Sequence, residues 1–347
     1  MTTRTRYFVV VSLLVLTVGL GSGLVAYYVG FPAGALGQHA GPLELEYIPR
    51  DATLIAFANV HEVMTSDLRQ RLRRAVPMHE NGQRELQEQT GINIETDLDR
   101  VVACVHPDSA STSMPGAGMV LARGRFDEVK IEALMREHGA HVEDYSGKRL
   151  IVGDATKDIN IGDDRKHLGG SFALSFVEPG LAAIGSTKLI KSAIDLHRAG
   201  NNPQAGLESV TGNEELMNLV KSMDDGNAWA VGRFDALRSQ AHLPDNVSSQ
   251  IPAITWFAVN THINGGIRGT IRAEARDDVA ANNLRDVVRG FLALAKMQTN
   301  SKPELQAMVD SLEVGGANKT VSLAFTVPSE VFDLVGAVAK QAAPRQH

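Results

Sequence analysis

The sequence predicts an α+β protein in which an N-terminal transmembrane helix precedes an ectodomain of mostly antiparallel sheet with helices on one face. Three observations support this fold class. Residues 7–31 contain no charged side chain, apolar runs typical of strands lead directly into amphipathic helices, and the same order of strands and helices recurs in the second half of the chain.

Residues 7–31 are predicted to form an uncleaved transmembrane signal-anchor. At about 1.5 Å per residue, a helix of this length crosses a hydrocarbon core of about 30 Å with some tilt. Arg4 and Arg6 precede the run and the first charge after it is Glu44. The positive-inside rule therefore places residues 1–6 in the cytoplasm and the bulk of the chain in the periplasm or outside the cell, as a single-pass protein of the inner membrane.

The alternative to an anchor is a signal peptide cleaved after Ala35, because Ala33-Gly34-Ala35 has the small side chains that signal peptidase accepts. The uncharged run is longer than the apolar core of about 7–15 residues in secretory signals, which favours the anchor. Its partner would be the lipid bilayer, through residues 7–31. Gly19 and Gly23 have the spacing that lets membrane helices pack closely, against an envelope protein or a second copy, but glycine is also common in membrane helices without such contact, and this second interpretation is favoured.

The composition excludes several other classes of partner. Of 347 residues, 44% are hydrophobic and 21% are charged, as in an ordinary folded protein. The net charge of −6 disfavours nucleic acid, which needs clustered Lys and Arg. Cys104 is the only cysteine, so no intrachain disulfide is possible. It lies in an apolar run at 101–105, which predicts a buried thiol.

The first α+β unit is predicted to span residues 48–200, after a tether at 32–47 that is rich in Gly, Ala and Pro. Its elements follow from apolar runs, periodicity of 3.6 and turn residues. Strands are expected at 52–60, 97–105 and 117–126; helices at 61–76, 80–90, 128–138 and 187–197; and hairpins at 142–154 and 171–186, with turns at Ser146-Gly147 and Glu178-Pro-Gly180.

The second α+β unit, residues 207–343, is predicted to repeat the first after a break at Gly200–Gly206. Four segments correspond in the same order: 227–237 to 52–63, 254–262 to 101–105, 269–284 to 119–134, and 321–328 with the helix 329–341 to 172–179 with the helix that follows it. Both strand-to-helix junctions carry an Asp, Asp127 and Asp277, where a helix cap accepts free N–H groups. This pattern predicts an internal duplication.

The opening Tyr47-Ile-Pro-Arg-Asp-Ala52, the segment 91–101 and the segment Gly185-Ser-Thr-Lys-Leu-Ile-Lys191 resemble bacterial membrane-anchored extracytoplasmic proteins of unknown function. In that family an anchor precedes an ectodomain that begins Pro-x-Asp/Ala-Ala. The resemblance covers residues 47–200. It implies the location and the fold, and it carries over no active site.

The sequence predicts no catalytic residue and no cofactor. His61-Glu62 resembles the start of a zinc helix, but Thr65 stands where the second His is needed. Alternating oxygen-bearing side chains make Asp158, Asn160, Asp163 and Asp164 candidates for a calcium loop. The twelfth position of that loop is Gly169, which lacks the carboxylate of an EF-hand, so a solvated acidic turn is the competing interpretation.

Three classes of function remain open at this stage. The first is a membrane-anchored binding or scaffold module without catalysis. The second is a carrier that encloses an apolar ligand, for which a deep apolar pocket would be evidence. The third is a hydrolase with a scattered site, for which a cleft with converging titratable groups would be evidence.

Overall fold

The computed structural model describes residues 42–75, 87–88, 90–106, 118–154, 157–161, 164–168, 171–199, 206–223, 226–234, 254–299 and 303–332. By their contacts these residues divide into two compact units. The N-terminal unit comprises the described parts of 31–61 and 81–222. The C-terminal unit comprises those of 62–80 and 223–347. Within each unit the neighbouring strands are antiparallel, and the strands that a unit contributes are described below as the sheet of that unit.

The sheet of the N-terminal unit has the strand order β1-β2-β3-β9-β8-β5-β4, and every neighbouring pair is antiparallel. The strands are β1 (Leu54–Asn59), β2 (Leu98–Val105), β3 (Gly118–Gly124), β4 (His141–Tyr145), β5 (Lys148–Asp154), β8 (Ser171–Glu178) and β9 (Leu181–Ser186). A separate hairpin pairs β6 (Lys157–Ile161) with β7 (Asp164–Leu168). The helices are η2 (Leu43–Tyr47), α6 (Ile94–Asp97), α7 (Glu128–Glu137), α8 (Thr187–Ala199), η5 (Val210–Gly212) and α9 (Glu214–Lys221).

The predicted hairpin turns are confirmed. The β4–β5 turn places Ser146 and Gly147 at φ 52° and 76°, as a two-residue loop between right-twisted strands requires. The β8–β9 turn places Gly180 at φ 75°, a conformation that glycine adopts without steric cost. The register of both hairpins therefore follows from residues that the sequence marks as turns.

The predicted helix 61–76 is two helices, α3 (Val60–Thr65) and α4 (Asp67–Ala75). Ser66 separates them, because its Oγ accepts the N–H of Arg69 at 3.2 Å and donates to the carbonyl of Val63 at 2.6 Å. Such a serine favours a helix start over a helix interior. Of the predicted helices 80–90 and 329–341, the greater part lies outside the described residues.

Helices cover both faces of the N-terminal sheet, so the prediction of helices on one face is wrong. Val142 and Ile151 are register partners, and Ile151 packs in one core cluster with Ile131 of α7. Side chains alternate along a strand, so Tyr145, three residues after Val142, points to the opposite face of the sheet. There Tyr145 donates from its hydroxyl to Asp195 of α8 at 2.7 Å. Residues 142 and 145 thus reach α7 and α8 from opposite sides of one strand.

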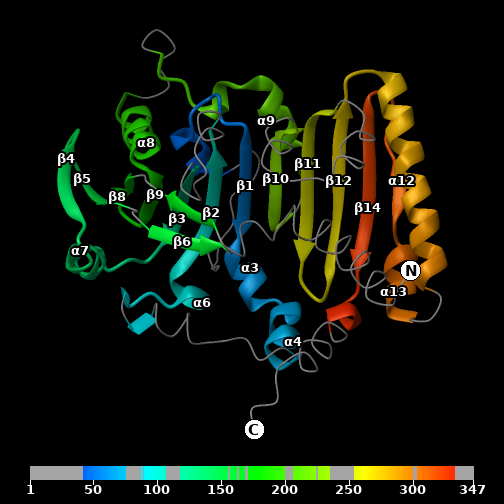
Figure 1. Cartoon of the computed structure of the whole chain (residues 1–347), viewed down its shortest axis with the longest axis horizontal. Helices are drawn as coiled ribbons and strands as arrows, with labels where there is room; N and C mark the ends of the chain where they lie inside the picture. Colours follow the sequence, from blue (N-terminus) through cyan, green and yellow to red (C-terminus); the bar gives the residue numbers. More distant parts are fainter. Residues whose placement is uncertain are drawn as a thin grey trace. The chain divides into compact units, whose positions relative to one another are not determined.

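The sheet of the C-terminal unit has the order β13-β14-β12-β11-β10, again with antiparallel neighbours. Its strands are β10 (Ala228–Arg233), β11 (Ile254–Ile263), β12 (Ile267–Ala275), β13 (Glu313–Gly315) and β14 (Thr320–Val327). Two helices, α12 (Asp278–Thr299) and α13 (Pro303–Asp310), connect β12 to β13. In Figure 1, α12 runs alongside β14, which it contacts together with β12 and β13.

The two units share an order of elements. In each, three consecutive antiparallel strands lead into a helix, and a later strand returns to pair with the third: β9 with β3, and β14 with β12. The predicted Asp caps are confirmed. Asp127 Oδ1 accepts the N–H of Lys130 at 3.0 Å, and Asp277 Oδ1 accepts that of Ala280 at 2.8 Å. After the helix the units differ, because α12 and α13 stand where the N-terminal unit forms β4 and β5.

Among the described residues, no helix combines the length and the apolar character needed to cross a membrane. This finding contradicts the predicted fold class, which opens with a transmembrane helix, and the membrane and signal-anchor features attached to it. The longest described helix, α12, buries Ala281 and Leu284 against the sheet and carries charged side chains elsewhere. Residues 7–31, with Gly19 and Gly23, lie outside the described residues.

Candidate functional site

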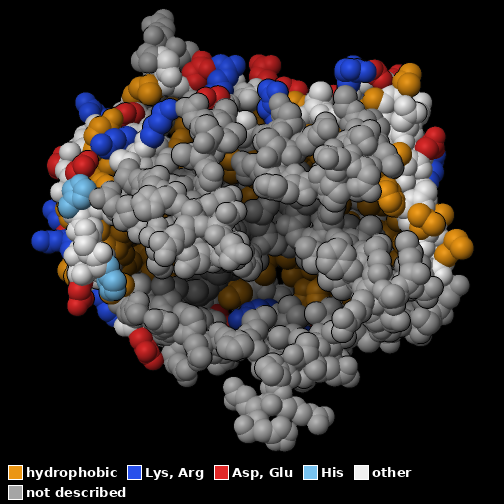
Figure 2. Space-filling view, in the orientation of Figure 1, with side chains coloured by type: hydrophobic (Ala, Val, Ile, Leu, Met, Phe, Trp, Pro, Cys, Tyr) orange, Lys and Arg blue, Asp and Glu red, His pale blue; other side chains and the backbone are white. Residues whose placement is uncertain are grey.

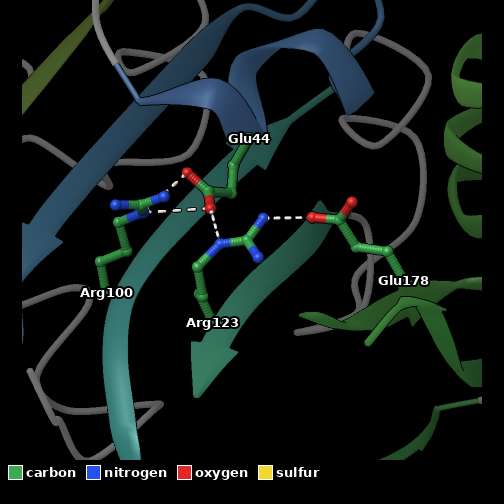
Figure 3. A network of polar contacts seen from close by, with 4 residues as sticks. All are labelled: Glu44, Arg100, Arg123 and Glu178. Carbon is green, nitrogen blue, oxygen red and sulfur yellow. Dashed lines mark hydrogen bonds and ion pairs between the residues drawn. The ribbon is translucent and has the colours of Figure 1, made fainter. Parts of the chain in front are cut away.

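A buried carboxylate links η2 to the N-terminal sheet (Figure 3). Glu44 is 0% exposed, and both of its oxygens lie 3.0 Å from Nε of Arg100 on β2. The Nε of Arg123 on β3 donates to the same carboxylate. Two guanidinium groups therefore compensate one buried negative charge, which would be costly to desolvate alone.

The network continues from Arg123 to Glu178 at the end of β8. Burial alone would raise the pKa of Glu178, but the hydrogen bond and charge of Arg123 outweigh it and hold that pKa below its ordinary value. Burial, with the charge and hydrogen bond of Glu178, raises the pKa of the Tyr47 phenol. The Tyr47 ring stacks on the His197 imidazole, with centroids 4.9 Å apart.

The charges of this network balance, since two carboxylates meet two guanidinium groups that bond them directly. Each charged side chain of the network forms its ion pair with another member of the network. The arrangement therefore fixes the short η2 helix, which starts without a side-chain cap, to three strands of the sheet. Its geometry is that of a structural clamp.

The N-terminal unit also has a cavity of about 500 Å³, a volume within the range of small-molecule sites. Four segments line it, of which the first three are the loop before β1 with Arg50 and Asp51, the residue after β2, His106, and one face of α8. The segment 206–213 completes the lining. The cavity therefore brings together titratable and apolar side chains that lie far apart in the sequence.

Hydrogen bonds fix the wall formed by the loop before β1. The N–H of Arg50 donates to the carbonyl of Glu208 at 3.0 Å, and the carbonyl of Arg50 accepts from Nδ2 of Asn213 at 3.2 Å. The side chains of Arg50 and Glu208 also form an ion pair. Two residues before Arg50, the carbonyl of Ile48 accepts the N–H of Val210 at 2.8 Å. These bonds within the chain hold the wall in place, and a preformed wall lowers the entropy cost of binding.

An imidazole and a carboxylate meet in the cavity lining. Nε2 of His106 lies 2.9 Å from Oδ2 of Asp51, and the side chains are 14% and 62% exposed. Their segments are adjacent because Thr53 donates its N–H to the carbonyl of Val105 at 2.8 Å. The carboxylate thus faces solvent while the imidazole is largely covered.

Helix α8 contributes to the cavity one stripe of side chains whose polarity falls along the helix. Lys188, Ser192 and Leu196 line it at intervals of four residues, which places them on one stripe of the helix. Lys188 is exposed in the first turn, Ser192 is half-buried, and Leu196 is buried. The stripe therefore runs from a charge through a hydroxyl to an apolar side chain.

A second hollow, of about 520 Å³, lies at the edge strand β4 and the end of α7. Of its lining residues, Arg136, His141, Glu143 and Arg149 form ion pairs with neighbours. Arg149 binds both oxygens of Glu132, at 3.0 and 2.6 Å, and Glu143 contacts His141 and Lys191, each at 3.2 Å. These pairs are exposed, so they contribute little to stability and mark no site.

The predicted calcium loop is a β-hairpin in the structure. The backbone pairs Asp158 with His167, Asn160 with Arg165, and Ile161 with Asp164. Asp163 lies outside the described residues. In the part of the chain that the structure describes, no group of three or more His, Cys, Asp or Glu side chains has the arrangement of a metal site. The calcium site stays an untested prediction.

The cavity residues were missed by sequence reasoning. Arg50 and Asp51 belong to the opening motif that carries the family resemblance, but there they indicate only a turn before a strand. His106 and Ser192 have no spacing that connects them to Asp51 or to each other. The only available signal was the polar residues Lys188 and Ser192 on an otherwise amphipathic helix, a pattern that is also typical of a solvated face.

The described part of α12 exposes large apolar side chains, Val279, Phe291, Leu294 and Met297. Figure 2 shows orange side chains along the side where Figure 1 draws this helix. The opposite face of α12 is the one that packs on the sheet of the C-terminal unit.

Comparisons of the chain with protein-family models, with curated proteins and with solved structures give no match. The resemblance to anchored extracytoplasmic proteins therefore stays a prediction, and so does the placement of the chain outside the cytoplasm.

Proposed function

We propose that the protein is a binding module that holds a small ligand in the cavity of its N-terminal unit. The observation that carries the proposal is the ordered wall at Arg50, which backbone and side-chain bonds hold in place. A site that is formed before the ligand arrives pays less entropy on binding. The carrier hypothesis is less well supported, because charged side chains share this lining with the apolar ones.

A cavity-filling variant tests the proposal. A fragment library is screened against the wild-type chain by ligand-observed NMR, and the hits are measured again with Ser192→Phe, whose ring would occupy the cavity. Ala199→Phe is the matched control, because residue 199 is exposed on the same helix and does not line the cavity. We expect hits that bind the wild type and the control but lose binding in Ser192→Phe. Equal binding to all three proteins, or no hits, would contradict the proposal.

A second candidate is a hydrolase, favoured by one observation: the Asp51–His106 pair and the Ser192 hydroxyl line the same cavity. In the described part of the chain Ser192 makes no hydrogen bond that would occupy its hydroxyl. A fluorophosphonate probe separates the two functions, with Ser192→Ala as the control for the site of labelling. A mass increase at Ser192 would replace the binding module by a hydrolase, and the binding module predicts an unlabelled serine.

A further inference from the structure

Strand β4 is the edge strand of the N-terminal unit, because it ends the strand order and pairs, among the described strands, with β5 only. Figure 1 shows it at the end of the strands of this unit. An edge strand presents a row of N–H and C=O groups that can bond a further strand. The free side of β4 is therefore a place where this sheet can be extended.

The register of the β4–β5 hairpin decides which residues of β4 direct their backbone outward. Tyr145 and Lys148 flank a two-residue turn, so these two residues exchange hydrogen bonds. Bonded and non-bonded pairs alternate along an antiparallel ladder, so the N–H and C=O groups of Val142 and Asp144 point away from β5. Among the described residues, none bonds these groups from the outer side.

The hollow of about 520 Å³ follows this edge. The consecutive residues 140–144 line it, together with Arg136 and Arg149. The ion pairs around it mark no site by themselves, but the space lies beside the outward backbone groups of β4. Val142, which is half-buried against the core cluster under α7, lies in the middle of this lining. The hollow therefore leaves room for the side chains of an added strand.

The charges of β4 select one way in which a second copy of the strand can pair with it. In an antiparallel pair, outward residues must face outward residues, so a symmetric pair is centred on residue 142, 143 or 144. The last two registers place Glu143 or Asp144 directly opposite its own copy, and like charges in that position are destabilising. The register centred on Val142 instead places each His141 opposite the partner's Glu143. Within one chain these two side chains already pair at 3.2 Å, so imidazole and carboxylate are complementary.

We infer that the free edge of β4 binds a second copy of the chain, β4 against β4, antiparallel and centred on Val142. The two Val142 residues exchange N–H···O bonds and pack against each other, and each Asp144 N–H donates to the carbonyl of the partner's Ala140. The contact is confined to a short strand, so the dimer is weak and reversible. This interaction goes beyond the proposed binding function, and no residue of the ligand cavity takes part in it.

Single cysteines test the register. In the full chain with Cys104→Ser, the variants Val142→Cys, Glu143→Cys and Asp144→Cys are oxidised in turn, and the covalent dimer is quantified on non-reducing gels. The inferred register places the two Cα atoms of residue 142 about 5.5 Å apart, within reach of a disulfide, but those of residue 143 about 8 Å apart. We expect Val142→Cys to cross-link about tenfold faster than the other two variants. Equal rates at all three positions, or a faster rate at 143 or 144, would overturn the inference.

A proline tests the role of the backbone. Asp144→Pro removes one outward N–H group and leaves the bonds between β4 and β5, and proline is tolerated on an edge strand at such a position. Asp144→Ala is the matched control, because it removes the same side chain and keeps the N–H group. Sedimentation velocity over a range of protein concentrations should show a reversible dimer for the wild type and Asp144→Ala, and about tenfold weaker association for Asp144→Pro. Far-UV circular dichroism checks that all three are folded.

A charge exchange tests the side-chain pairing in the same measurement. His141→Glu places two carboxylates opposite each other and should weaken the dimer, and the double variant His141→Glu/Glu143→Lys should restore it, because opposite charges then face each other again. A wild-type chain that stays monomeric at every concentration would overturn the inference. So would a dimer that is equally strong in the wild type, Asp144→Pro and His141→Glu, because its interface would then lie elsewhere on the chain.

Discussion

The Nε atom of Arg100 lies 3.0 Å from both carboxylate oxygens of Glu44, a side chain with no solvent exposure. The two residues are 56 positions apart in the sequence, and their contact connects the start of the described chain to strand β2. Because Arg123 binds the same carboxylate, the loss of this one charge leaves the Arg100 guanidinium without its carboxylate and leaves Arg123 with Glu178 alone.

Glu44→Gln should therefore destabilise the N-terminal unit. Breaking a buried ion pair by removing one partner costs about 3–5 kcal/mol, and the partial exposure of both arginines reduces the expected loss to about 2–3 kcal/mol. Urea denaturation followed by far-UV circular dichroism measures it. Glu46→Gln in the same short helix is the control, since Glu46 is exposed and should change the stability by less than about 0.5 kcal/mol.

The phenol of Tyr47 should ionise at a higher pH than the phenol of an exposed tyrosine. Burial first, then the charge of Glu178 and its hydrogen bond, raises the pKa above its ordinary value of 10.0. The folded state thus favours the protonated phenol. This stabilisation is complete below the unfolded pKa, near 10, and is lost as the pH rises toward the folded value.

Absorbance at 295 nm, recorded against pH for the folded chain and in urea, measures the ionisation of Tyr47. Of the five tyrosines, we expect at least one to ionise at higher pH in the folded chain than in urea. Tyr47→Phe should remove the latest part of this ionisation, while Tyr145, whose pKa is raised by its hydrogen bond to Asp195, should still ionise above its ordinary pH. A folded wild-type curve that coincides with the curve in urea would show that the phenol is not shielded.

The sequence was sufficient for most strands and for the hairpin turns, but not for the strands β6, β7 and β13 or for the faces that the helices cover. Ser146-Gly147 and the Asp caps at 127 and 277 act on the residues beside them, so local patterns predict them. Which face α7 and α8 cover depends on the register of β4 against β5, which involves contacts across the sheet. The break at Ser66 was missed because the apolar periodicity continues through it.

The candidate site was not predictable for a related reason. Asp51, His106 and Ser192 come from three separate segments, and only the pairing of β1 with β2 and the packing of α8 place them around one cavity. Glu44 likewise lies in residues 32–47, whose Gly, Ala and Pro content predicts a tether. Hydrophobic patterns carry no information on which distant charges meet in the folded chain.

Cys104 should be unreactive in the folded chain. It is buried, as its apolar surroundings predicted, and burial raises the pKa of its thiol to about 12. Because the thiolate is the reacting form, a disulfide reagent such as DTNB at pH 8 should label it only after the N-terminal unit opens. As the only cysteine, it gives one unambiguous signal, which Cys104→Ser should abolish. Rapid labelling without denaturant would contradict the buried position.

Two glycines should respond to alanine in opposite directions. A Cβ on Gly124, at the end of β3, would lie 2.3 Å from the carbonyl oxygen of Asp97 and 2.6 Å from Cα of Leu98. Both atoms belong to the backbone and cannot rotate away. Gly124→Ala should therefore lower the free energy of unfolding by about 1–3 kcal/mol, the usual cost of overpacking.

Gly290 lies in the interior of α12, and no atom within 4 Å would meet its Cβ. Glycine in a helix interior costs about 0.5–1 kcal/mol relative to alanine, so Gly290→Ala should raise the stability of the C-terminal unit by that amount. Trp229 and Trp256 both lie in that unit, so fluorescence during urea denaturation follows it selectively. A lower denaturation midpoint for Gly290→Ala would mean that this exposed face of α12 has a neighbour that the added methyl group displaces.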